Sequence, residues 1–135
     1  MIYLLDTNTC IGYLNRRNPS IYQHLLAVSA DDVCICDVVK FELYYGAYKS
    51  SRTAENLENL SNFFGDLVSL PFDGQAAEIC GQLRATLQAA GTPIGAYDLQ
   101  IAAIALARNL ILVTHNTREF QRIPQLQLED WESDG

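Results

Sequence analysis

Four short apolar runs constrain the fold of this 135-residue chain more than any other feature. The runs span residues 2–5, 33–36, 67–71 and 110–113. The first does not alternate between apolar and polar residues, which is typical of a strand buried on both faces of a parallel sheet. The segments between the runs have apolar residues at helical spacing. This alternation predicts an α/β fold, a doubly wound parallel β-sheet with helices on both faces.

The expected elements follow from this alternation. Asp37 and Asp73 are interpreted as residues that cap or open helices. A short fifth strand is expected over residues 125–128, followed by an acidic C-terminal tail from about 129 to 135, and the whole of 1–135 is expected to form a single domain. Helices are predicted over about 9–15, 18–26, 38–45, 57–64, 73–90 and 96–109.

Composition excludes several classes of protein. Hydrophobic residues make up 49% of the chain and charged residues 19%, which excludes a disordered chain. The net charge of −7 argues against a strongly basic, non-specific binder of nucleic acid. No apolar run approaches the roughly 18 residues of a membrane helix, and no signal peptide is recognisable, so a cytoplasmic protein without a membrane partner is expected.

Cysteine and histidine spacing gives no sign of a metal site. The four cysteines form no CxxC pair, and the two histidines, His24 and His115, lie far apart in the sequence. Free thiols in a reducing compartment are therefore expected. Tyr44, Tyr45 and Tyr48 gather on one predicted helix, where core packing or a groove for a partner helix is favoured over stacking on bases.

Carboxylates occur where a buried or catalytic group is expected. In a parallel sheet, sites lie beyond the carboxyl ends of the strands. Asp6 follows the first strand and Glu119 follows the fourth, whereas Glu42 and Asp98 lie on the apolar faces of their helices. Each has a structural explanation, such as capping, snorkelling or the helix dipole. Four such carboxylates together favour metal binding over a purely structural network.

A site built only from oxygen ligands selects a hard cation, Mg²⁺ or Mn²⁺. Such an ion binds phosphate oxygens and activates water, which predicts phosphodiester hydrolysis. Thr7, Thr114 and Asn116 are candidates for supporting hydrogen bonds, although turn formation and capping would also explain them. Arg118 and Lys40 are candidates for contacts with RNA phosphates, with ordinary surface charge as the alternative.

Four motifs resemble those of the PIN-domain nucleases, and more narrowly those of the VapC-type toxins of bacterial VapBC toxin–antitoxin pairs. The motifs are Leu4–Asn8 (LLDTN), Glu42–Gly46 (ELYYG), Gly95–Asp98 (GAYD) and Thr114–Phe120 (THNTREF). They occur in this order over the whole chain, which also ends on a similar segment, Leu126–Trp131.

The resemblance implies that Asp6, Glu42 and Asp98 bind the metal ion and that Glu119 is the fourth acid. It also implies a Mg²⁺- or Mn²⁺-dependent endoribonuclease that acts as the toxin of a type II pair and inhibits translation and growth. A cognate VapB-type antitoxin and a homodimer are further expectations. Toxins with this motif set often cut tRNA, the initiator tRNA in particular.

Four other functions are alternatives to this interpretation. A haloacid-dehalogenase-type phosphatase needs a second acid where Asn8 stands, and a receiver domain needs paired early acids and a late lysine. A DNA-directed nuclease of the same fold usually has insertions for which this chain has little room. A non-catalytic PIN-like interaction domain is the remaining alternative. It would show no Mg²⁺- or Mn²⁺-dependent cleavage of RNA.

The charge distribution is compatible with an RNA substrate. Four acids lie in the last seven residues and four more form the proposed site. The remaining eight acids face nine Lys and Arg residues, so the rest of the chain carries +1. Substrate choice is therefore expected to depend on shape and a few local contacts, with moderate sensitivity to salt.

Overall fold

The computed structural model describes residues 1–132. Five parallel strands form one sheet in the order β3-β2-β1-β4-β5. The strands are β1 (Tyr3–Leu5), β2 (Val33–Cys36), β3 (Val68–Leu70), β4 (Ile111–Val113) and β5 (Leu128–Glu129). The helices are α1 (Thr7–Leu14), α2 (Pro19–Ala27), α3 (Asp37–Lys49), α4 (Thr53–Phe64), α5 (Gly74–Ala89), α6 (Ala96–Ala107) and α7 (Thr117–Phe120), and a 3-10 turn spans Ala30–Asp32. The predicted α/β class is confirmed.

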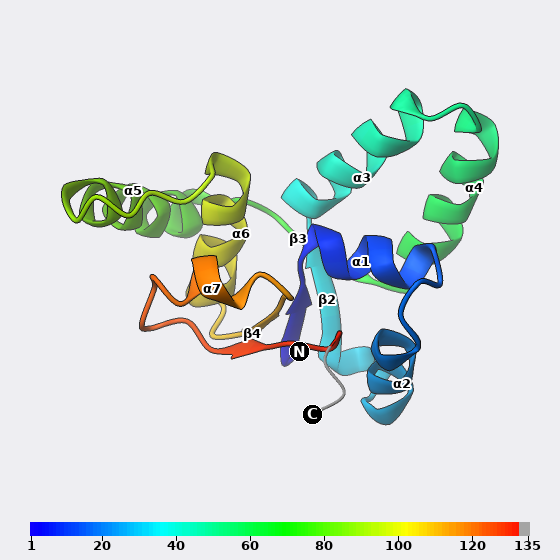
Figure 1. Ribbon diagram of the computed structural model, residues 1–135, viewed down its shortest axis with the longest axis horizontal. Helices are drawn as coiled ribbons and strands as arrows, with labels where there is room; N and C mark the ends of the chain where they lie inside the picture. The colour runs from blue at the N-terminus through cyan, green and yellow to red at the C-terminus, as the bar shows by residue number, and fades with distance from the viewer. Residues whose placement is uncertain (133–135) are drawn as a thin grey trace.

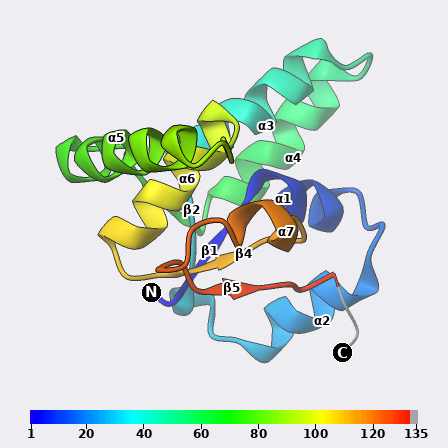
Figure 2. The same cartoon turned by 60° about the vertical axis from the view of Figure 1, so that its left-hand side comes forward.

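Helices flank the sheet on two sides. Figure 1 shows α1, α2 and α4 on one side of the strands and α5, α6 and α7 on the other. The alanine-rich helix α6 contacts both α5 and β4, so it forms the inner layer of its side, and Figure 2 shows α5 beside it. Ile101, Ala102 and Ala105 on α6 are fully buried, which explains why this helix is apolar almost all round.

The strand order has a topological switch point at β1. The chain moves from β1 to β2 and β3 in one direction, and then crosses to β4 and β5 on the other side of β1. Leu4 and Leu5 of β1 are completely or almost completely buried, as is Leu112 of β4. In open α/β sheets the binding crevice forms at such a point, outside the carboxyl ends of the strands.

Some element boundaries differ from the sequence predictions. Helix α1 begins at Thr7 rather than Thr9, because Asp6 is its N-cap and its side chain accepts a hydrogen bond from Thr9 N. The prediction that Asp37 caps a helix is wrong. Asp37 is the first residue of α3, and its carboxylate accepts a hydrogen bond from Ser69 on β3 at 2.6 Å. Helix α7 was not predicted, and β5 lies at 128–129 rather than over 125–128.

The segment after β5 packs against the body of the protein. Trp131 is 1% exposed and contacts Tyr3 edge-on, and its ring stacks on His24. The tail predicted from about 129 to 135 is therefore folded up to residue 132, and its last three residues lie outside the described residues.

The structure also bears on the predictions for the tyrosines, the cysteines and membrane-spanning helices. Tyr44, Tyr45 and Tyr48 are all exposed, so core packing is wrong for them. The four cysteines are free, as expected, although Cys80 is only half-buried. No helix within residues 1–132 is long and apolar enough to cross a membrane.

Candidate active site

Asp6 lies at the carboxyl end of the central strand. Its backbone N–H donates to the carbonyl of Val113 on β4 at 3.0 Å, and its Oδ1 accepts from the Thr9 N–H at 2.8 Å. The residue is only 4% exposed, and this burial raises the pKa of its carboxyl group, while hydrogen bonds from Thr114 and Thr9 oppose the rise. A second buried threonine hydroxyl, that of Thr9, donates to the Val113 carbonyl.

Glu42 on α3 is joined to the start of α1. The Thr7 hydroxyl donates to Glu42 Oε1 at 2.6 Å, across 35 residues of sequence. Helix α3 begins directly after β2, so the second turn of α3 carries Glu42 past the same edge of the sheet where Asp6 lies. The hydrogen bond fixes one carboxylate oxygen, and the other keeps acceptor capacity for a further partner.

Asp98 lies in the first turn of α6, at the end of that helix nearest the carboxyl end of β4. Its pKa is raised to about 6, first by burial and then by the negative charges of Glu119, Asp6 and Glu42. Asp98 therefore lies within electrostatic range of the two other predicted core acids and of the fourth acid. We call Asp6, Glu42, Asp98 and Glu119 the carboxylate cluster.

Glu119 on α7 uses both carboxylate oxygens within the protein. Its Oε2 accepts from the Asn116 side-chain amide at 2.8 Å, and its Oε1 accepts from the Gly95 N–H at 3.3 Å. Asn116 is held in turn, because its backbone N–H donates to the Thr114 hydroxyl at 3.0 Å. The predicted supporting residues Thr114 and Asn116 therefore connect β4 to Glu119 and, through Gly95, to the start of α6.

The donor set of the carboxylate cluster fits a hard divalent cation. Within residues 1–132, none of the four acids forms an ion pair with Lys or Arg. In that part of the chain no three of them have oxygens within 4.8 Å of one another, as expected when like charges face each other. Oxygen donors with excess negative charge select Mg²⁺ or Mn²⁺ over softer ions.

The two basic candidates differ in their surroundings. Lys40 Nζ lies 5.0 Å from the centre of the Phe64 ring, a cation–π distance, and Lys40 is half-buried. Arg118 is exposed on α7, next to Glu119. Arg122 donates to the Pro93 carbonyl at 2.7 Å and so helps to attach α7 to the loop before α6. The roles of Lys40 and Arg118 in RNA binding stay predictions.

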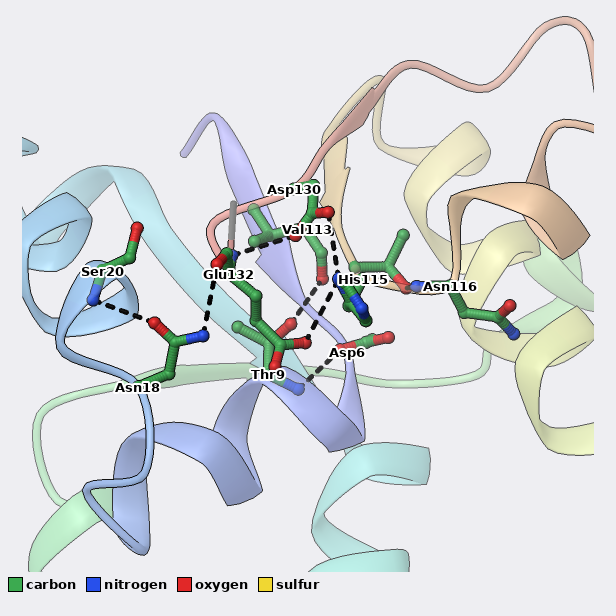
Figure 3. A network of polar contacts seen from close by, with 10 residues as sticks. Asp6, Thr9, Asn18, Ser20, Val113, His115, Asn116, Asp130 and Glu132 are labelled. Atoms are coloured by element: carbon green, nitrogen blue, oxygen red, sulfur yellow. Dashed lines mark hydrogen bonds and ion pairs between the residues drawn. The ribbon is translucent and has the colours of Figure 1, made fainter. Parts of the chain in front are cut away.

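A second cluster beside the first was missed in the sequence. His115, Asp130 and Glu132, which we call the His115 cluster, each offer a ligand atom within 4.8 Å of the others (Figure 3). Parallel pairing of Val113 with Glu129 places the residues that follow β4 and β5 side by side. The spacing of these residues in the sequence could not reveal the His115 cluster, because His115 and Asp130 are 15 residues apart. The expected fifth strand was the one sequence signal that the segments after β4 and β5 lie together.

The chain is similar to PIN-domain proteins over most of its length. The PIN domain model matches residues 3–126. The tRNA(fMet)-specific endonuclease VapC of Salmonella typhimurium is 42% identical over 96% of this chain and 97% of its own length. Ribonuclease VapC2 of Rickettsia felis is 40% identical, over 98% and 99% of the two chains.

Solved structures of VapBC complexes also contain chains with the same fold as this protein. A chain of DNA-bound VapBC from Salmonella typhimurium has a TM-score of 0.92 at 41% identity, covering 97% of this chain and 98% of that one. A chain of VapBC2 from Rickettsia felis, bound to a DNA fragment from its promoter, has a TM-score of 0.90 at 39% identity, over 97% and 99%. These matches favour the PIN-domain interpretation over the phosphatase and receiver alternatives. The chain therefore belongs to the PIN-domain family and, within it, to the VapC group.

Proposed function

We propose that this protein is a metal-dependent endoribonuclease and the toxin of a type II toxin–antitoxin pair. The observation that carries the proposal is the carboxylate cluster. Burial and then the negative charges of three other acids raise the pKa of Asp98, and no Lys or Arg within residues 1–132 forms an ion pair with any of the four acids. The relatives named ribonuclease VapC support the RNA substrate.

Asp6, Glu42 and Asp98 would hold Mg²⁺ or Mn²⁺, with Glu119 as the fourth acid of the site. When bound, such an ion activates water and stabilises the charge that develops on a phosphodiester during in-line attack. The hydrogen bonds of Glu119 to Asn116 and Gly95 suit a carboxylate that acts through an ion-bound water.

The surrounding polar groups would hold these carboxylates in place. Thr9 and Thr114 orient Asp6, and Thr7 orients Glu42. The raised pKa of Asp98 means that its carboxyl group is half ionised at about pH 6 and is mostly ionised only well above that pH, unless a cation lowers the pKa. Arg118 and Lys40 are the proposed contacts for RNA phosphates on either side of the site.

The substrate we propose is tRNA, with the initiator tRNA as the first to test. The relative in Salmonella typhimurium, 42% identical, is a tRNA(fMet)-specific endonuclease. Cleavage of an initiator tRNA would stop translation and growth. We place this activity in the cytoplasm, where tRNA is used.

The partner we propose is a VapB-type antitoxin, because the similar solved structures are VapBC complexes. A hollow of about 690 Å³ between α1, α2 and α4 offers it a docking surface. Aromatic rings of Tyr13, Tyr22 and Phe63 line the hollow beside polar groups such as Asn59 and Asn62, a combination that suits an amphipathic helix. We also propose that the protein forms a homodimer.

Mapping new RNA 5′ ends after induced expression tests the function. We expect growth arrest and ends concentrated at one position of one or a few tRNAs, and co-expression of the cognate antitoxin to abolish both. The purified protein should cut the same RNA with Mg²⁺ or Mn²⁺ and stop when EDTA is added. Cleavage that continues in EDTA, or ends scattered over all transcripts, would contradict the proposal.

A further inference from the structure

The His115 cluster combines the ligand types of a transition-metal site. His115 Nδ1 lies 3.0 Å from Asp130 Oδ2 and 3.8 Å from Glu132 Oε2. Two ligand atoms that each lie about 2.1 Å from a tetrahedral zinc ion are about 3.4 Å apart, a value between these two distances. Both carboxylates thus lie near the imidazole at about the spacing that a shared ion would require, and all three ligand atoms lie within 4.8 Å of one another.

The backbone that carries the three side chains is held from outside the cluster. His115 follows β4 directly, after the buried Thr114. Asn18 at the start of α2 donates to the backbone carbonyl of Glu132 at 3.2 Å (Figure 3). Between the two acids, Trp131 is buried against Tyr3 and His24, so the backbone that carries both carboxylates has little freedom to move. Binding would therefore cost little ordering of the ligands.

Charge at the cluster favours a cation. Within residues 1–132, neither Asp130 nor Glu132 forms an ion pair with Lys or Arg, and His115 is the cationic partner of both. With a neutral imidazole the cluster carries −2, and Asp6 adds a further negative charge nearby.

Access and ligand chemistry suggest which ion would bind. The His115 side chain is 64% exposed, so an ion can enter and keep water in its remaining positions. An imidazole ligand disfavours Mg²⁺ and Ca²⁺, which prefer oxygen, and suits Zn²⁺ and its neighbours in the transition series.

We propose that His115, Asp130 and Glu132 form a second metal site, separate from the carboxylate cluster, which binds a divalent transition-metal ion such as Zn²⁺. The ion would replace the hydrogen bond between His115 and Asp130. It would then fasten the segment after β5 to the loop after β4, next to Asp6.

Titration of the full chain with Zn²⁺ tests this proposal. The parent protein should carry Asp98→Asn, which weakens the carboxylate cluster. We expect it to bind about one equivalent of Zn²⁺ with a Kd below about 100 μM. His115→Gln and Glu132→Gln should each weaken binding at least about 10-fold. His115 is exposed and Glu132 is half-buried, and each substitution keeps a side chain of similar size, so neither change should impair folding. The melting temperature in EDTA verifies this.

His24→Gln is the matched control, because His24 is the other histidine of the chain and stacks on the ring of Trp131. It should bind Zn²⁺ like the parent. In ¹⁵N spectra of the histidine side chains, Zn²⁺ should shift Nδ1 of His115 and leave His24 unchanged. The proposal fails if the parent binds no Zn²⁺ up to about 1 mM, if His115→Gln binds as tightly as the parent, or if His24→Gln weakens binding equally.

Discussion

The carboxylate cluster and the His115 cluster lie next to each other, yet the protein builds them differently. The first draws its acids from four places in the chain, around a buried Asp6, and offers oxygen ligands alone. The second comes from two neighbouring strand ends, is open to solvent and includes an imidazole. Burial raises the pKa of Asp6 and Asp98, whereas hydrogen bonding and charge raise that of His115.

This difference shows that proximity alone does not make two clusters one site. A hard ion that activates water suits the cluster of oxygen ligands around the buried Asp6, at the switch point of the sheet. A borderline ion suits the exposed cluster, where it would stabilise a segment rather than take part in hydrolysis. The predictions below test that separation, in order of decreasing effect.

The largest effect is expected from removing a charge of the carboxylate cluster. Asp6→Asn and Asp98→Asn should each lower the rate of Mg²⁺-dependent RNA cleavage more than about 100-fold, because each removes a proposed ligand of the ion. Single-turnover cleavage of the mapped tRNA measures this. Asp66→Asn, at an exposed aspartate far along the chain from the motifs, is the control and should cleave normally. Undiminished cleavage by Asp98→Asn would remove that residue from the mechanism.

A smaller effect is expected from the residue that orients Glu42. Thr7→Val should lower the cleavage rate about 10-fold and raise the Mg²⁺ concentration needed for half-maximal rate, because Glu42 loses its 2.6 Å hydrogen bond. Thr7→Ser keeps the hydroxyl and should retain most of the activity. Full activity in Thr7→Val would show that the hydroxyl of Thr7 has no part in positioning Glu42.

Asp98→Asn should raise the stability of the folded protein although it lowers the cleavage activity. The native pKa of about 6 exceeds the ordinary 3.8, so the folded state binds more protons than the unfolded state between these values. The stability contributed by protonated Asp98 is therefore lost as pH rises from about 4 to about 6. In EDTA at pH 7, Asp98→Asn should raise the melting temperature by about 1–4 °C.

Mg²⁺ should stabilise the wild type more than it stabilises Asp98→Asn, since the ion binds only the ionised cluster. A variant that melts below the wild type in EDTA would show that Asp98 is not destabilised by its neighbours.

The smallest effect on the cleavage rate is expected from substituting His115, which lies in the neighbouring cluster. His115→Gln should change the rate of Mg²⁺-dependent cleavage by no more than about threefold, or about 0.7 kcal/mol in activation free energy. A loss as large as that of Asp98→Asn would mean that the two clusters act as one site. Adding Zn²⁺ should raise the melting temperature of the wild type more than that of His115→Gln, in keeping with a structural role.

Much of the fold follows from local sequence signals. The apolar runs predicted four of the five strands closely, because the central strands β2, β1 and β4 are covered on both faces and need hydrophobic residues throughout. Capping chemistry placed the start of α5 at Asp73, which accepts a hydrogen bond from Ala76 N–H. Capping failed at Asp37, since Cys36 takes the cap position and Asp37 instead bonds to Ser69 on a strand that is distant in sequence.

The sequence by itself determined the α/β class, the motifs and the residues of the carboxylate cluster, because each acid follows a buried strand or interrupts an apolar helix face. Only the tertiary structure decided which groups donate hydrogen bonds to those acids. Thr7 donates to Glu42, and Asn116 and Gly95 donate to Glu119. It also decided that the C-terminal acids lie beside His115. That contact depends on the register of β4 against β5, and a register between distant strands is fixed by packing of the whole sheet rather than by any local pattern.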